Sequence, residues 1–158
     1  MHDKNKSIPL YCCIPMFFLL SCTQPKITLH ELFSSVAQEY QLPTPELFDP
    51  STSIIQLSPQ KKLSLQERHD DVELMLYTGM QLSQAATIQN ASLALHQIGI
   101  INYELAANKV QVDPENTDII LSCFLDVETL HKSLLERRVL QLIKDEQKVR
   151  ETLSSALY

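Results

Sequence analysis

Hydrophobic side chains recur at intervals of three or four residues along much of the chain, a pattern typical of amphipathic helices. Thr28 and Glu31 stand at the spacing of a capping box, in which both side chains bond free backbone amides at a helix start. Residues 29–41 are therefore predicted to form a first helix. Its apolar positions are Leu29, Leu32, Phe33, Val36 and Tyr40.

The following segment, residues 42–62, has no regular pattern. Four prolines and the run Ser51-Thr52-Ser53 interrupt any long helix here. The segment is nevertheless too apolar for a solvated linker, because it contains Phe48, Ile54, Ile55 and Leu57. We expect it to fold back across the helices, and a ligand- or partner-binding loop is the alternative interpretation.

A second, long helix is predicted over residues 64–109, because Ser64 and Glu67 repeat the capping-box spacing. From Leu74 to Tyr103, 30 consecutive residues include no Asp, Glu, Lys or Arg. A helix that faces water normally carries charges on its outer side. We therefore expect this helix to be covered nearly all round, either inside a bundle or inside an oligomer.

The last helix is predicted over residues 114–156, with Asp113 as its cap and Pro114 at its first position. Two long helices joined by a short connection lie antiparallel. The expected fold class is therefore all-α: a long antiparallel helical hairpin with coiled-coil packing, a short N-terminal helix, and the proline-containing loop packed on it.

Composition and charge support the same picture. The chain has only two glycines and no tryptophan, which disfavours a turn-rich β-fold. Its net charge is −6, and its basic residues form no cluster, so a nucleic-acid partner is not expected.

The N-terminal segment has the parts of a secretory signal. Lys4 and Lys6 precede an apolar run over residues 8–20, which ends in Leu19-Leu20-Ser21-Cys22. The run is shorter than the roughly 20 residues that a membrane-spanning helix needs. The ending resembles the lipobox of bacterial lipoproteins, and an ordinary signal peptide or a chance apolar stretch are the alternatives.

The resemblance implies a division of the chain and a location. Residues 1–21 would be a cleaved signal peptide, Cys22 would carry palmitate or a similar lipid, residues 22–27 would form a tether, and residues 28–158 a single domain. Because Thr23 rather than Asp follows the Cys, the resemblance implies the outer membrane of a Gram-negative cell envelope, with the protein facing the periplasm.

Cys123 would then be the remaining free thiol, so no internal disulfide is expected. Its neighbours Ile119, Ile120, Leu121, Phe124 and Leu125 are hydrophobic. Buried thiols in such surroundings behave as small hydrophobic side chains. Cys123 is accordingly expected in the core rather than as a nucleophile.

Glu128 and His131 have the Glu-x-x-His spacing of di-metal helical bundles, and the predicted hairpin would bring His96 near them. Such a site needs a second motif and further carboxylates, which the uncharged segment does not supply. We interpret the match as accidental and expect no catalytic residue, no metal and no cofactor other than the lipid.

The expected function is that of an outer-membrane-anchored, non-enzymatic binding or assembly factor for an envelope protein complex. Helical pilotins of secretion systems are an analogy in architecture. The candidate partner-binding residues are Leu93, Ile100, Leu142, Val149 and Leu153. The alternatives are a self-assembling structural lipoprotein, and a metal-dependent helical-bundle enzyme that uses Glu128, His131 and His96.

Overall fold

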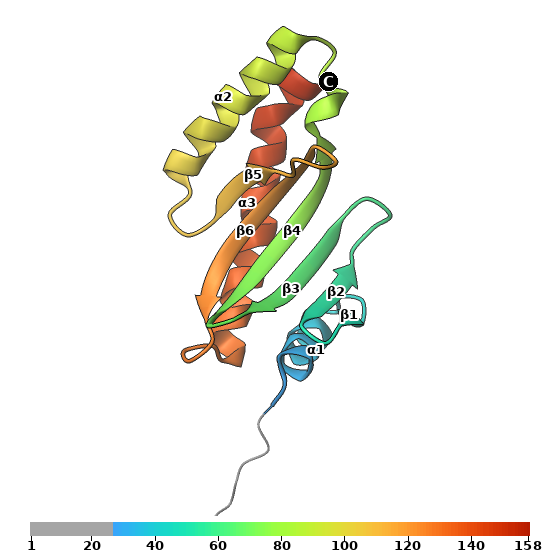
Figure 1. The fold of residues 1–158 in the computed structure, drawn as a ribbon, viewed down its shortest axis with the longest axis vertical. Helices are drawn as coiled ribbons and strands as arrows, with labels where there is room; N and C mark the ends of the chain where they lie inside the picture. The colour runs from blue at the N-terminus through green and yellow to red at the C-terminus, as the bar shows by residue number, and fades with distance from the viewer. Residues whose placement is uncertain (1–26) are drawn as a thin grey trace, which may run out of the picture.

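The computed structural model describes residues 27–158, which form three α-helices and one six-stranded antiparallel sheet (Figure 1). The strand order in the sheet is β1-β2-β3-β4-β6-β5. In chain order the elements are α1 (Leu29–Glu39), β1 (Glu46–Asp49), β2 (Thr52–Gln56), β3 (Lys62–Arg68), β4 (Asp71–Gln81), the 3-10 helix η1 (Leu82–Gln84), α2 (Ile88–Glu104), β5 (Lys109–Val112), β6 (Asp118–Asp126) and α3 (Lys132–Leu157).

The all-α prediction is wrong, and no helical hairpin or coiled coil is formed by the described residues. Residues 64–109 contain most of β3, β4, η1, α2 and the start of β5 instead of one helix. Residues 114–156 contain a turn, β6 and α3. The supposed cap Ser64 lies in the middle of β3, where it pairs with Met75 of β4.

The first helix is present where the sequence predicts it. The Thr28 hydroxyl accepts a hydrogen bond from the Glu31 amide at 3.2 Å, and the Glu31 carboxylate accepts one from the Thr28 amide at 2.8 Å. These two bonds form the predicted capping box.

The first four strands form an antiparallel meander, and α2 then carries the chain to β5 at the opposite edge. Strand β6 returns between β5 and β4. Helices α1 and α3 contact each other, and α3 runs along one face of the sheet (Figure 1). The molecule is elongated, with α1 and β1 at one end and α2 and the C-terminus at the other.

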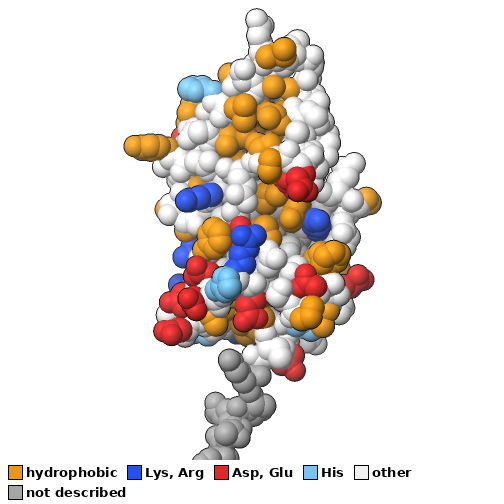
Figure 2. Space-filling model, viewed as in Figure 1, with side chains coloured by type: hydrophobic (Ala, Val, Ile, Leu, Met, Phe, Trp, Pro, Cys, Tyr) orange, Lys and Arg blue, Asp and Glu red, His pale blue; other side chains and the backbone are white. Residues whose placement is uncertain are grey.

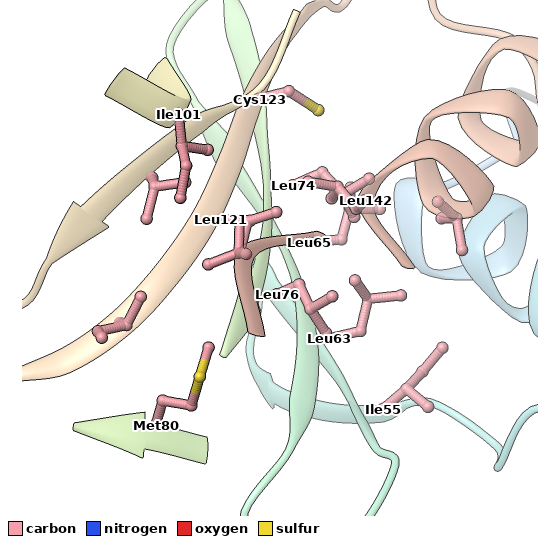
Figure 3. Packing of buried hydrophobic residues seen from close by; sticks show 14 of the residues in the cluster. Ile55, Leu63, Leu65, Leu74, Leu76, Met80, Ile101, Leu121, Cys123 and Leu142 are labelled. Carbon is pink, nitrogen blue, oxygen red and sulfur yellow. The ribbon is translucent and has the colours of Figure 1, made fainter. Parts of the chain in front are cut away.

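The core lies between the sheet and these helices. Leu65 pairs with Leu74, and Leu74 pairs with Cys123, so the three side chains share one face of the sheet. Leu142 of α3 meets Leu65 and Leu74 there (Figure 3). The side chains that α3 buries completely include Leu135, Val139, Leu142, Val149 and Leu153.

The opposite face of the sheet carries no helix in the described part of the chain, yet its centre is nearly closed to solvent. Ser64, Met75 and Ser122 form a cross-strand row there and are buried. Beside them, the buried carboxylate of Glu73 pairs with Arg68 at 2.7 Å. The middle of β4, at Leu74, Met75 and Leu76, is therefore buried on both faces of the sheet, which accounts for the absence of charged side chains there.

Candidate protein-binding surfaces

A largely apolar groove lies at the α1 end of the molecule, with a volume of about 710 Å³. Its walls come from α1, the β1–β2 turn, β2, β3 and the turn before α3. The apolar side chains that line it include Leu29, Leu32, Leu47, Leu65, Val127 and Leu130. A pocket of this size and lining can hold several apolar side chains of a ligand.

The groove has a polar rim. His30 Nδ1 lies 3.0 Å from Ser53 Oγ, and Glu31 and Glu67 also line the opening. The hydrogen bond from the Thr28 amide lowers the pKa of Glu31 below its ordinary value, so this carboxylate stays charged in mildly acidic solution. The rim thus places polar and acidic groups around an apolar floor.

Strand β1 borders this groove and forms one edge of the sheet, since β2 is its one partner strand. Leu47 is 59% exposed and Phe48 is 76% exposed. The pairing of β1 with β2 shifts between Leu47 and Asp49, where Phe48 has no partner residue. An edge strand with exposed hydrophobic side chains is suited to contact another chain.

A second apolar surface is the outer side of α2. This helix buries Ala94, Ile98 and Ile101 against the rest of the chain. Ile88 and Tyr103, which are 87% and 97% exposed, face away from the buried side together with Leu95. Figure 2 shows hydrophobic side chains gathered at this end of the molecule, whereas acidic and basic side chains gather in its lower half.

The expectation that the uncharged helix is covered nearly all round does not hold within the described chain. The outer side of α2 has a shallow hollow of about 620 Å³, lined by Leu95, His96, Gly99, Ile100, Tyr103 and Glu104. Glu104 is the one charged residue of this helix, and it pairs with Lys148 of α3 at 2.5 Å.

The five predicted partner-binding residues separate into two groups. Leu142, Val149 and Leu153 are completely buried in the core and present no surface to a partner. Leu93 and Ile100 are about half exposed on α2, so their contact with a partner stays a prediction.

The residues proposed for a metal are not assembled as the bundle hypothesis requires. Glu128 lies in the turn that follows β6, and His131 is the cap of α3, so they do not share a helix face. His131 Nδ1 is used in accepting a hydrogen bond from the Leu134 amide at 3.3 Å. His96 lies on the outer side of α2, and residues 27–158 contain no group of three or more His, Cys, Asp or Glu side chains that could hold a metal ion.

Cys123 is buried on the helix-facing side of β6. Burial raises the pKa of its thiol to about 11, so the thiolate is scarce at neutral pH. Since the thiolate is the reactive form, Cys123 acts here as a core side chain.

Residues 42–62 form β1 and β2 rather than an irregular loop, and they supply Leu47 and Ser53 to the groove, so the binding-loop alternative stays a prediction for this segment. The only sequence signal of the groove is the unusually apolar character of residues 42–62, to which Leu47 and Phe48 belong. Ile55 of the same segment is completely buried in β2, so the segment contributes to both the core and the surface.

The lipobox, Cys22 and most of the predicted tether lie outside the described residues, and lipidation stays a prediction. None of the helices within residues 27–158 has both the length and the hydropathy that a membrane crossing requires.

A scan against protein-family models and a search of curated proteins both find no match. Solved structures do share the fold. The HopA1–SchA chaperone–effector complex matches with a TM-score of 0.53 and 15% identity, over 76% of this chain and 91% of that chain. The type III secretion chaperone SycH of Yersinia pestis, in complex with a stable fragment of YscM2, matches with a TM-score of 0.53 and 13% identity, over 77% of this chain and 99% of that chain.

The fold is not confined to chaperones. YbjN from E. coli, which has been proposed to be a transcription regulator, matches with a TM-score of 0.56 and 8% identity, over 78% of this chain and 89% of that chain. At such identities the likeness establishes the arrangement of strands and helices, in place of the helical hairpin that the sequence predicts.

Proposed function

We propose that this protein is a non-enzymatic binding protein that holds an extended, apolar segment of a partner protein at its α1 end. The observation that carries this proposal is the apolar groove beside an open edge strand with Leu47 and Phe48 exposed. An extended segment would add to β1 through main-chain hydrogen bonds and place alternate side chains in the groove. The chaperone complexes that share this fold lend support.

Binding of fluorescent peptides tests the proposal. In one set of peptides apolar and polar residues alternate. In the other set the same residues stand in scrambled order. We expect the alternating peptides to bind by fluorescence anisotropy. Leu47→Glu should weaken binding at least tenfold, since it places a charge in the apolar wall of the groove. Leu140→Glu, at an exposed position of α3, is the matched control and should bind normally. Equal loss in both variants, or no binding by any peptide, would refute the proposal.

A second candidate function is self-association through the outer side of α2, defined by Ile88, Leu93, Leu95, Ile100 and Tyr103. Two copies of a chain with a net charge of −6 repel each other, and this repulsion is weakest when they meet through surfaces with few charges. The outer side of α2 carries one charged residue, Glu104, which pairs with Lys148, and this surface lies at the opposite end from the groove (Figure 1). Both surfaces can therefore be occupied at once.

Sedimentation velocity tests this second candidate. The unaltered protein should sediment as a dimer at tens of micromolar, whereas Ile100→Glu should sediment as a monomer because each copy would bury an unpaired carboxylate. Leu140→Glu should remain a dimer. A monomer in all three cases would exclude self-association through α2.

The membrane anchor remains part of the proposal. Acylation of Cys22 would hold the α1 end within about 18 Å of the membrane, which is the reach of five extended residues. The outer membrane of a Gram-negative envelope is the proposed location. Labelled palmitate should enter the protein and should fail to enter a Cys22→Ser variant, which should also leave the membrane fraction. Equal fractionation of the two proteins would argue against the anchor.

A further inference from the structure

The two edge strands of the sheet differ in whether their outward-pointing main-chain amide and carbonyl groups have hydrogen-bond partners. Strand β5 is the edge opposite to β1 and pairs only with β6, with Val110 opposite Leu121. In an antiparallel pair, the amide and carbonyl groups of alternate residues point away from the partner strand. At an edge such groups normally face solvent or accept another strand.

At Val110 these outward groups are bound by a side chain of the same protein. The Val110 amide donates to Asn102 Oδ1 at 2.6 Å, and Asn102 Nδ2 donates to the Val110 carbonyl at 2.8 Å. A carboxamide holds a carbonyl acceptor and an amino donor group in one plane, like the carbonyl and amide groups of the main chain. Asn102 therefore makes the two hydrogen bonds that a residue of a neighbouring strand would make.

The position of Asn102 is fixed by its helix. Ile98 and Ile101 precede Asn102 in α2, and both side chains are buried. Helix α2 contacts β5 along the side where a further strand would approach. Strand β5 has only four residues. With the main-chain groups of Val110 already bonded to Asn102, too few free groups remain on this edge for regular pairing with a further strand.

We propose that Asn102 closes the β5 edge, so that the sheet offers strand addition at β1 alone. Among the described residues, no side chain hydrogen-bonds to the backbone of β1. The closure of β5 stands on its own geometry, and only the use of β1 rests on the proposed function. Asn102 is thus a positioning residue that directs where a partner segment binds.

Hydrogen exchange of backbone amides in the full-length protein tests the closure. The Val110 amide should be protected although it lies on an edge, and Asn102→Ala should speed its exchange about 10- to 100-fold. The amides of Ile98 and Ile101 should exchange as before. Gln89→Ala, at an exposed site on the same helix, is the control and should leave Val110 unchanged. Unchanged exchange at Val110 in Asn102→Ala would overturn the proposal.

The stoichiometry of peptide binding supplies an independent readout. The alternating peptide should bind once to the unaltered protein, at β1, and no more than once to Asn102→Ala, because α2 still lies beside β5. A second site in the unaltered protein would contradict the closure. If Asn102→Ala loses its circular dichroism signal, Asn102→Asp serves instead, since it keeps the acceptor and removes the donor. If no peptide binds the unaltered protein, the proposed function fails, while the exchange result still decides the role of Asn102.

Discussion

Asn108 and Asp145 are joined by a hydrogen bond of 2.6 Å between Asn108 Nδ2 and Asp145 Oδ2, which ties the loop before β5 to α3. Both residues are buried, and the second carboxylate oxygen of Asp145 accepts a bond from Gln141 at 2.8 Å. A buried carboxylate needs such partners, because an unsatisfied polar group in the interior is costly. The pair therefore stabilises the junction on which the position of α2 depends.

Replacement of Asn108 by Ala should lower the free energy of unfolding by about 1–3 kcal/mol, because one oxygen of Asp145 would lose its partner while remaining buried. Urea denaturation gives the measurement. Gln147→Ala is the comparison, since Gln147 bonds Glu151 on the exposed side of the same helix, and its effect should stay within about 0.5 kcal/mol. Equal effects at the two sites would contradict this account.

The two glycines should respond to alanine with opposite signs. Gly79 has a φ of +74°, and an added Cβ would lie 3.0 Å from the Gln60 backbone oxygen, so Gly79→Ala should cost about 1–3 kcal/mol. Gly99 lies within α2 and a Cβ there would meet no atom within 4 Å, so Gly99→Ala should gain up to about 1 kcal/mol. Thermal unfolding of the two variants distinguishes them. A gain at Gly79 would show that the strand end is not strained.

Two leucines of α3 test the packing directly. Leu142 is completely buried, whereas Leu140 is 43% exposed on the same helix. Leu142→Ala should cost about 2–5 kcal/mol in the free energy of unfolding, because it leaves a cavity against the sheet. Leu140→Ala should cost less than about 1 kcal/mol. Similar losses would be incompatible with the orientation of α3 that the structure gives.

The ion pair between Glu39 and Lys132 connects α1 to the start of α3 and predicts a pH dependence. The hydrogen bond and charge of Lys132 lower the pKa of Glu39 below its ordinary value of 4.5. Folding thus favours the carboxylate form of Glu39. The pair contributes its full stabilisation above the pKa that Glu39 has in the unfolded chain. This contribution is lost as the pH falls through the lower pKa that Glu39 has in the folded protein. Stability measured from about pH 5 to pH 3 should fall less steeply in Glu39→Gln than in the unaltered protein.

Salt supplies the control for that measurement. Both side chains are about half exposed, so about 1 M NaCl should screen the pair and bring the two pH profiles together. Profiles that already coincide at low salt would mean that the pair contributes nothing to the association of α1 with α3.

The strands were missed in the sequence for an identifiable reason. Leu63 and Leu65 alternate, and so do Val72, Leu74 and Leu76, as expected for strands that bury one face. In β4, however, Met75 on the other face is also buried. The apolar residues are therefore adjacent, and adjacent apolar residues also satisfy the spacing of three and four that predicts a helix.

The candidate site was predictable only in part. The absence of charges predicts a covered helix, whereas the outer side of α2, including Leu93 and Ile100, is exposed within the described chain. Leu142 and Val149 were placed among the contacts because they share an apolar face of the last predicted helix, and α3 buries that face in the core. A pattern of apolar residues indicates that a face exists, but it does not say whether the sheet or a partner covers it.

The sequence by itself determined the features that depend on neighbouring residues: the capping box of Thr28 and Glu31 and the helix that it begins. The tertiary structure alone decided that Leu74 would pair with Cys123, and that α1, β1 and β3 would together enclose a groove. The physical reason is separation along the chain. A helix cap is satisfied within one turn, whereas a strand acquires its hydrogen bonds from residues that are distant in the sequence and become neighbours only when the sheet forms.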